Sequence, residues 1–273
     1  MDNNFLITAC ITHFNDADFI LNTLYCLKHL TKNSYKVIIR DNNSSIKQYR
    51  KLKKGIGDYK NVFLYRVENF KLKGSLAHGT ALNDLVGRID TPYGVIFDAD
   101  CTFLIKNWDE ILINQLQGKV KIIGTEVSRK EVKDFPFLFA VLFVSSTLKK
   151  LNIDFRPNDI SKAQDTGWNL RQKYLEAGIE GRLIEMKNTR VYKDGHFKDF
   201  LGVGEYYLNG DYEHIFACHF GRGSFSGAAK YTKGTSFIFR LPIIGKPLRK
   251  ARGKRDKKKW IKICQAIVAR QVS

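Results

Sequence analysis

The first hundred residues alternate between short apolar runs and longer amphipathic stretches, and this order restricts the fold more than any other feature. The apolar runs lie in residues 5–12, 35–45, 61–67 and 93–100, and the helical patterns lie in residues 19–30 and 74–89. Asp16 or Asp18 is in a position to cap the first helix. Strands that alternate with helices indicate a mostly parallel sheet covered by helices. We therefore expect an α/β fold.

The second half of the chain gives weaker patterns. Helices are expected near 106–117 and 165–178, and strands near 120–126 and 138–144. Residues 221–227 form a Gly- and Ser-rich loop, a composition whose backbone amides suit phosphates. A chain of 273 residues without an internal repeat is most simply one folded core with a tail.

Three polar clusters directly follow predicted strands: Thr12 to Asn15, Asp41 to Ser44, and Asp98 to Asp100. Ligands of open α/β sheets bind outside the carboxyl ends of the strands, so the clusters are expected to line one crevice. Alternation along a strand would point Asp98 and Asp100 to the same face, where a divalent cation would relieve their repulsion. The alternative is a strand end whose acidic residues form a turn.

The cysteines and the apolar segments indicate a cytoplasmic protein. The five cysteines are scattered and never form a Cys-x-x-Cys pair, which indicates reduced thiols without a thiolate zinc site. The N-terminus lacks a basic start and turns polar at Thr12 to Asp16, as expected for a first strand and not for a signal peptide. The longest apolar run, residues 135–144, is too short to span a bilayer.

The positive charge is concentrated at the C-terminus. From Arg240 onward the chain has twelve Lys or Arg residues and one acid, Asp256, so this tail carries +11 of the net charge of +19. Apolar residues recur there at helical spacing: Trp260, Ile263, Cys264, Ile267 and Val268. A basic amphipathic helix of this kind suits an anionic membrane surface. Docking of the same stripe on the core, or general binding to polyanions, are the alternatives.

The order of these segments resembles the family 2 glycosyltransferases of the GT-A fold, from about residue 5 to 225. The segments that look like family motifs are the opening strand and loop in 11–30, the second strand in 37–45, the Asp-x-Asp region in 69–101, the acceptor-side helix in 165–178 and the late strand in 214–224. The resemblance implies a Rossmann-like GT-A domain over 1–239, with its nucleotide-binding half in about 1–105 and its acceptor half in 106–239. A basic tail over 240–273 follows.

The resemblance also implies a metal site and a base. The nucleotide diphosphate leaves more easily where positive charge meets it, and Mg²⁺ or Mn²⁺ supplies that charge. Asp100 matches the family's main ligand, and Asp98 a contact to ribose or to a metal-bound water. His219 matches a late histidine that adds a ligand and would favour Mn²⁺, although a structural histidine is the alternative. Asp165 matches the general base, although Gln164 stands where many relatives have Glu, and a helix N-cap is the alternative role.

The other site residues are expected to hold the nucleotide. They are Thr12, His13, Phe14 and Asp41 near the base, and Lys73, Ser75, Asp98 and Arg222 near the ribose or phosphates. Phe14 suits stacking on the base, and Asp41 suits the imide hydrogen of uracil. Lys73 opens a helix whose N-terminus suits anions, and the planar fork of Arg222 suits a diphosphate. The alternatives are a core Phe14, a turn-forming Asp41 and a solvated Lys73.

Together these patterns predict a metal-dependent, inverting hexosyltransferase that uses a nucleotide sugar, with a UDP-sugar favoured. A glycan or lipid-linked saccharide is the expected acceptor, and attachment of residues 240–273 to the inner face of a membrane would suit the latter. Processive synthesis is not expected, because the chain has no Gln-x-x-Arg-Trp pattern. A nucleotidyltransferase and a non-enzymatic polyanion or nucleic-acid binder are the alternatives. Nucleic acid is not the expected partner, because such binders spread basic residues over their surface.

Overall fold

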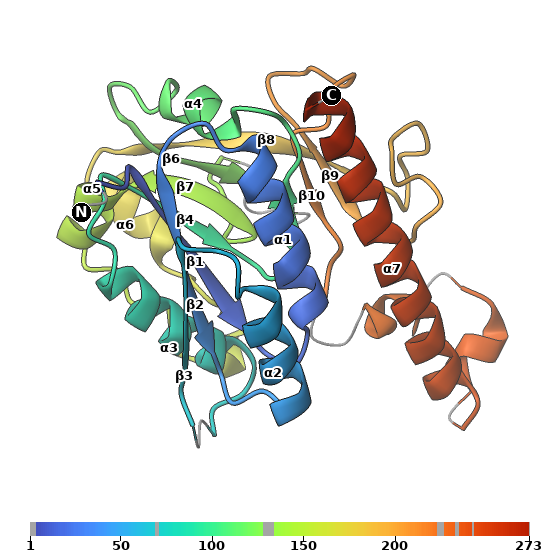
Figure 1. The fold of residues 1–273 in the computed structure, drawn as a ribbon. Helices are drawn as coiled ribbons and strands as arrows, with labels where there is room; N and C mark the ends of the chain where they lie inside the picture. Colours follow the sequence, from blue (N-terminus) through green and yellow to red (C-terminus); the bar gives the residue numbers. More distant parts are fainter. Residues whose placement is uncertain are drawn as a thin grey trace.

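The computed structural model describes residues 4–68, 71–127, 134–222, 227–232, 235–241 and 243–272. Within them, ten strands form one sheet in the order β3-β2-β1-β4-β7-β6-β8-β9-β10-β5, with helices on both faces (Figure 1). The strands are β1 Ile7–His13, β2 Tyr35–Asp41, β3 Val62–Arg66, β4 Tyr93–Phe97, β5 Cys101–Phe103, β6 Val120–Thr125, β7 Ala140–Val144, β8 Glu180–Asn188, β9 Gly204–Tyr207 and β10 Ala217–His219. The α-helices are α1 Ala17–Leu30, α2 Ile46–Gly55, α3 Gly74–Gly87, α4 Trp108–Ile113, α5 Ser145–Lys150, α6 Leu170–Glu176 and α7 Gly245–Val272.

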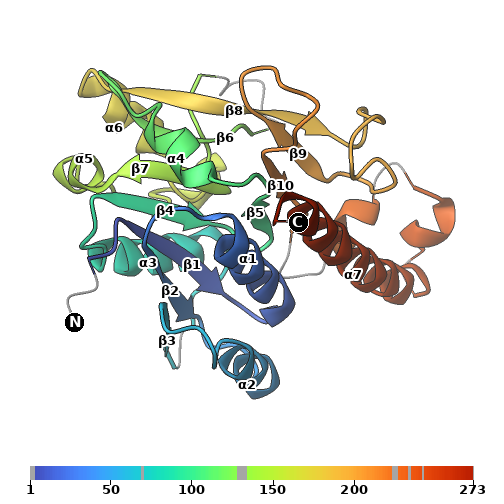
Figure 2. The same cartoon turned by 45° about the horizontal axis from the view of Figure 1, so that its top comes forward.

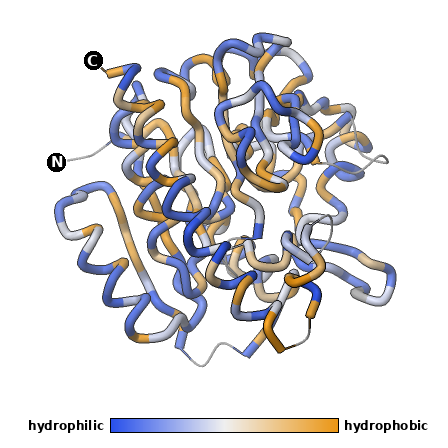
Figure 3. Tube along the Cα trace, turned by 90° about the vertical axis from the view of Figure 1, so that its right-hand side faces the viewer, coloured by the Kyte–Doolittle hydropathy of each residue, from blue (hydrophilic) through white to orange (hydrophobic). Residues whose placement is uncertain are grey.

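Strands β1 to β4 form the parallel part of the sheet that the sequence predicts. β1 lies between β2 and β4 and is parallel to both. Ala9 and Ile11 of β1 belong to a core shared with α1, whereas Cys10 belongs to a second core that contains Leu82 of α3. Burial on both faces explains the continuous apolar runs of these strands. Figure 3 shows hydrophilic residues on the outer sides of the helices.

The second half of the sheet is mixed. β7 is antiparallel to β4 and β6, β8 is parallel to β6, and β8, β9, β10 and β5 follow one another antiparallel. The strands expected near 120–126 and 138–144 are present as β6 and β7. Helices α4 and α6 are shorter than predicted. Asn107 before α4 and Gly167 before α6 have positive φ, which helical residues do not adopt, so both helices begin later than expected.

Helix α7 packs along α1 in the same direction (Figures 1 and 2). Its buried apolar side chains include Trp260, Cys264, Ile267 and Val268. The Trp260 ring contacts Phe19 of α1 with ring centroids 5.6 Å apart. Of the uses left open for the apolar stripe of the tail, docking on the core is therefore the one found in the fold. Among the described residues, no helix is long and apolar enough to cross a bilayer.

A partly buried group of ion pairs joins α7 to the start of α1. Lys257 Nζ lies 2.8 Å from Asp16 Oδ1 and 3.2 Å from Asp18 Oδ2. Asp16 occupies the N-cap position of α1, but its side chain makes no capping hydrogen bond. Since α7 begins at Gly245, twelve of its residues precede Lys257 and extend beyond the start of α1.

Candidate active site and metal centre

The three polar clusters lie at the carboxyl ends of adjacent strands, as predicted. β1 ends at His13, β2 ends at Asp41, and β4 ends directly before Asp98. The backbone N–H of Asn42 donates to the carbonyl of His13 at 2.9 Å, which joins the first two ends. The clusters therefore share one edge of the sheet.

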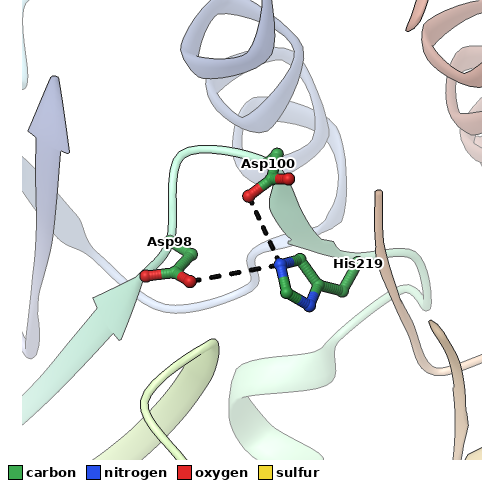
Figure 4. A group of neighbouring side chains, drawn as sticks. All are labelled: Asp98, Asp100 and His219. Atoms are coloured by element: carbon green, nitrogen blue, oxygen red, sulfur yellow. Dashed lines mark ion pairs between the residues drawn. The ribbon is translucent and has the colours of Figure 1, made fainter. Parts of the chain in front are cut away.

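Asp98, Asp100 and His219 converge at this edge (Figure 4). Their ligand atoms all lie within 4.8 Å of one another. His219 Nε2 is 3.3 Å from Asp100 Oδ1 and 4.0 Å from Asp98 Oδ2. Asp100 Oδ2 is buried and accepts no hydrogen bond from the described part of the chain. Two carboxylates, an imidazole and one buried oxygen without a donor fit a divalent cation, and the nitrogen ligand suits Mn²⁺.

The two acids converge for a different local reason from the one expected. β4 ends at Phe97, and both acids lie in the tight turn between β4 and β5. The backbone N–H of Phe220 donates to the carbonyl of Asp100 at 2.9 Å, which ties this turn to the end of β10. The turn, and not alternation along a strand, therefore brings Asp98 and Asp100 to His219.

The charges within the cluster are unequal. Burial raises the pKa of Asp98 to about 6, against the opposing effects of His78 and His219. Burial also acts to raise the pKa of Asp100, but His219 and Lys230 outweigh it and leave that pKa below its usual value. Burial acts to lower the pKa of His219, yet Asp100 and Asp98 raise it overall. Asp100 is therefore the carboxylate that stays ionised most readily, which suits a main metal ligand.

Two residues beside the cluster were missed from the sequence. His78 of α3 places Nε2 3.6 Å from Asp98 Oδ1. Lys230, in the 3₁₀ turn Ala228–Thr232, is buried and donates from Nζ to the carbonyl of Phe220. Burial lowers the pKa of Lys230 to about 8, although Asp100 acts in the opposite direction. His78 lies one turn into the helix predicted at the carboxyl edge of the sheet, and this position could have indicated a site residue. No local sequence pattern indicates Lys230.

The negative charge of Asp165 contributes to the raised pKa of Asp98. Ser75 Oγ donates to Asp165 Oδ1 at 2.5 Å, and the backbone N–H of Thr166 donates to the same oxygen at 2.9 Å. Helix α6 begins only at Leu170. Asp165 is therefore not its N-cap, which was the alternative left open by the sequence.

The residues expected near the base differ in exposure. His13 Nδ1 and Asp41 Oδ2 are 2.7 Å apart, and both side chains are fully buried. The backbone N–H of Ser44 donates to Asp41 Oδ1 at 3.2 Å, so both oxygens of Asp41 have partners. Phe14 is 51% exposed, and Thr12 is half-buried. Phe14 is therefore not a core residue, and it presents an aromatic surface at the edge of the sheet.

The residues expected near the phosphates lie at two places. Lys73 is exposed at the N-cap position of α3. Arg222 is exposed and lines a cavity of about 330 Å³ together with Arg190 and Lys230. The other lining residues are Asn188, Gly202, Gly221, Ala229 and Thr232. Residues 223–226, which complete the expected Gly- and Ser-rich loop, lie outside the described residues.

The helix-covered α/β sheet, with its Asp-x-Asp turn and late histidine at the carboxyl edge, agrees with the GT-A fold that the sequence resembles. The sequence model described as Glycosyl transferase family 2 matches residues 8–178, so the chain belongs to this family. The protein is therefore a glycosyltransferase. This assignment replaces the alternative of a non-enzymatic polyanion binder.

Many solved structures are similar to this fold, and two of them are glycosyltransferase complexes. The mannosyltransferase PcManGT from Pyrobaculum calidifontis, in complex with GDP-Man and Mn²⁺, is 15% identical with a TM-score of 0.54, over 98% of this chain and 75% of its own. GalNAc-T7 with UDP, GalNAc and Mn²⁺ is 12% identical with a TM-score of 0.52, over 67% of this chain and 43% of its own. No curated protein matches the chain in sequence.

Proposed function

We propose that the protein transfers one hexose per encounter, with inversion, from a nucleotide sugar to a glycan or lipid-linked saccharide. A UDP-sugar is the first candidate donor. The observation that carries this proposal is the cluster of Asp98, Asp100 and His219 with its buried oxygen that lacks a donor. The carboxylates of half-buried Asp98 and buried Asp100 repel each other at this separation, and a bound cation would remove that cost.

Asp100 and His219 would be the principal ligands of Mn²⁺, with Asp98 on the ion, on a bound water or on the donor ribose. When bound, the ion would neutralise the negative charge that develops on the departing nucleoside diphosphate. The imidazole nitrogen among the ligands favours Mn²⁺ over Mg²⁺. The presence of Mn²⁺ in both similar structures supports this choice.

Asp165 is the proposed general base. It would take the proton of the acceptor hydroxyl while that oxygen bonds to the anomeric carbon and the bond from this carbon to the diphosphate breaks. The hydrogen bonds from Ser75 and Thr166 would fix the orientation of the carboxylate. Gln164 has a structural role, because its Oε1 accepts the backbone N–H groups of Asn158 and Asp159 at 2.9 and 2.7 Å.

The nucleotide would bind along the edge formed by the ends of β1 and β2, with the base stacked on the exposed ring of Phe14. Asp41 is fully buried, so its proposed contact with a uracil imide requires the turn at Ser44 to open. The hydrogen bond between Asp41 and His13 would order this pocket even if the turn at Ser44 stays closed. Lys73 and Arg222 are the proposed cations for the diphosphate.

Thermal unfolding in the presence of nucleotides tests the proposal. UDP, GDP, ADP, dTDP and their sugar derivatives would be added, with and without Mn²⁺, to the wild type and to Asp100→Ala. We expect one nucleotide class to raise the Tm of the wild type only with Mn²⁺. A ligand at a hundred times its Kd raises the free energy of unfolding by roughly 2.7 kcal/mol, which shifts the Tm measurably. The exposed Asp58→Ala is the matched control and should respond like the wild type. A normal response of Asp100→Ala, or a response to heparin or RNA alone, would contradict the proposal.

A further inference from the structure

A cluster of exposed apolar side chains lies at the start of α7. Its members, here called the apolar tip, are Phe237, Ile238, Ile243, Ile244 and Leu248. Phe237 is 72% exposed and Ile243 is 87% exposed, whereas Trp260 further along α7 is fully buried. The tip joins the 3₁₀ turn Phe237–Arg240 to the first turn of α7, and the backbone N–H of Gly245 donates to the carbonyl of Leu241 at 2.9 Å. Large apolar residues gathered on one short segment indicate an interaction surface.

The sequence around the apolar tip carries only positive charge. Residues 235–255 contain seven Lys or Arg residues and no Asp or Glu. The exposed ones are Arg240, Lys246, Lys250, Lys254 and Arg255. Apolar side chains among exposed Lys and Arg match the boundary between the acyl chains and the headgroups of an anionic membrane. A second copy of this chain would bring two surfaces of the same charge together, so charge favours lipid over self-association.

The apolar tip lies at the same end of the molecule as the candidate active site. Lys257 of α7 is level with Asp16 and Asp18 at the start of α1. The twelve helical residues before Lys257 extend about 18 Å further, at 1.5 Å per residue. Figure 1 shows the carboxyl ends of β1 and β2 and the start of α7 at one end of the molecule.

We propose that the apolar tip inserts into the surface of an anionic membrane and that the acceptor is therefore lipid-linked. The acceptor class rests on the proposed function, whereas the membrane contact does not. This contact differs from the one expected from the sequence, because the stripe around Trp260 is buried in the core and different residues would reach the lipid. With the tip in the membrane, the edge that carries Asp98, Asp100 and Asp165 would lie near the headgroups, within reach of a short lipid-linked saccharide.

Vesicle co-sedimentation of the full chain tests the membrane contact. The vesicles would be phosphatidylcholine alone or a two-to-one mixture with phosphatidylglycerol. We expect the wild type to bind the anionic vesicles, Ile243→Asp to lose roughly tenfold in affinity, and Lys250→Glu to bind more weakly at low salt. The matched controls are Leu175→Asp on α6, which also replaces an exposed apolar side chain, and Lys53→Glu on α2, and both should bind like the wild type.

Equal binding by Ile243→Asp and the wild type, or no binding of the wild type to anionic vesicles, would overturn the membrane contact. A dimer that Ile243→Asp dissociates, without any vesicle binding, would also overturn it and would make the tip a subunit interface. The Mn²⁺-dependent rise in Tm with nucleotide should persist in all four variants. Its absence from the wild type would refute the proposed function and leave the membrane contact untouched. For the acceptor, label from the donor is expected in the organic extract of native membranes, and label only in water-soluble glycan would overturn that assignment.

Discussion

Trp260 of α7 donates its indole N–H to Cys218 Sγ, 2.9 Å away, one residue before the candidate metal ligand His219. The same indole contacts Phe220, the residue after His219, with ring centroids 5.8 Å apart. Helix α7 therefore packs directly behind the strand end that carries the histidine. The C-terminal segment, which the sequence suggested as a separate tail, supports the candidate active site.

Trp260→Ala is expected to lower the free energy of unfolding by about 3–5 kcal/mol, because it removes a fully buried aromatic side chain. Trp260→Phe should cost about 1–3 kcal/mol, through the lost hydrogen bond and the smaller volume of the ring. Urea unfolding measures both changes. Trp168 is 39% exposed, so Trp168→Ala is the control and should lower the free energy of unfolding less. A chain that ends at Phe239, the predicted domain boundary, should fail to fold for the same reason. Full stability of Trp260→Ala would contradict this role of α7.

Lys230 is expected to make stability depend on pH. Its pKa is about 8 in the folded protein, because of burial, against 10.5 as the ordinary value. Between these values the unfolded chain binds more protons than the folded chain, so the free energy of unfolding rises with pH. The free energy of unfolding should rise by about 3 kcal/mol from pH 8 to 10.5 because of Lys230. Lys230→Met should lack this rise. Urea unfolding of both proteins in EDTA measures the difference, and identical pH dependence would contradict the prediction.

His78 is expected to tune metal binding through Asp98. The interaction with His78 lowers the pKa of Asp98, against the burial that raises it to about 6. His78→Gln should therefore raise this pKa further, so that Mn²⁺ competes with a proton over a wider pH range. Titration calorimetry should show Mn²⁺ affinity reduced more at pH 6 than at pH 8, by roughly tenfold for each unit of added pKa shift. The exposed His214→Gln is the control, and an equal reduction at both pH values would refute the role of His78.

Asp165→Asn is expected to lower kcat by roughly 10²- to 10⁴-fold, because the acceptor hydroxyl would lose its base. The affinity for nucleotide and Mn²⁺ should change far less than kcat, since Asp165 would act on the acceptor and its charge is the smallest of the effects on Asp98. Ser75→Ala should reduce kcat less, because the backbone N–H of Thr166 still holds the same oxygen. Initial rates with the donor identified by thermal unfolding measure these effects. An unchanged kcat in Asp165→Asn would assign the base to another residue.

The parallel half of the fold could be predicted because its strands are buried on both faces, which makes each of them a continuous apolar run. Helix α2 was missed because five of its ten residues are Lys or Arg and only Leu52 is buried. Strand β8 was missed because only Ile184 among its nine residues is buried, so it shows neither a continuous run nor a strict alternation. These elements depend on partners that lie far away in the sequence.

The candidate site was predictable where a residue belongs to a local motif. Asp98 and Asp100 follow a recognisable strand, and the resemblance to a family supplied Asp165 and His219. Lys230 acts through contacts between distant parts of the chain, so no local pattern could indicate it. The amphipathic pattern of the tail was detected, but it could not show whether lipid or the core covers the apolar stripe, because both satisfy the same hydrophobic requirement.

Asp98, Asp100 and His219 are proposed to form the metal centre of a nucleotide-sugar site. Anomalous X-ray diffraction at the manganese edge, from crystals grown with Mn²⁺ and the responding nucleotide, tests it most directly. We predict one strong peak between Asp100 and His219 that is in contact with the diphosphate and is absent from Asp100→Asn. A nucleotide bound without a peak at this position, or a peak only elsewhere on the molecule, would contradict the claim.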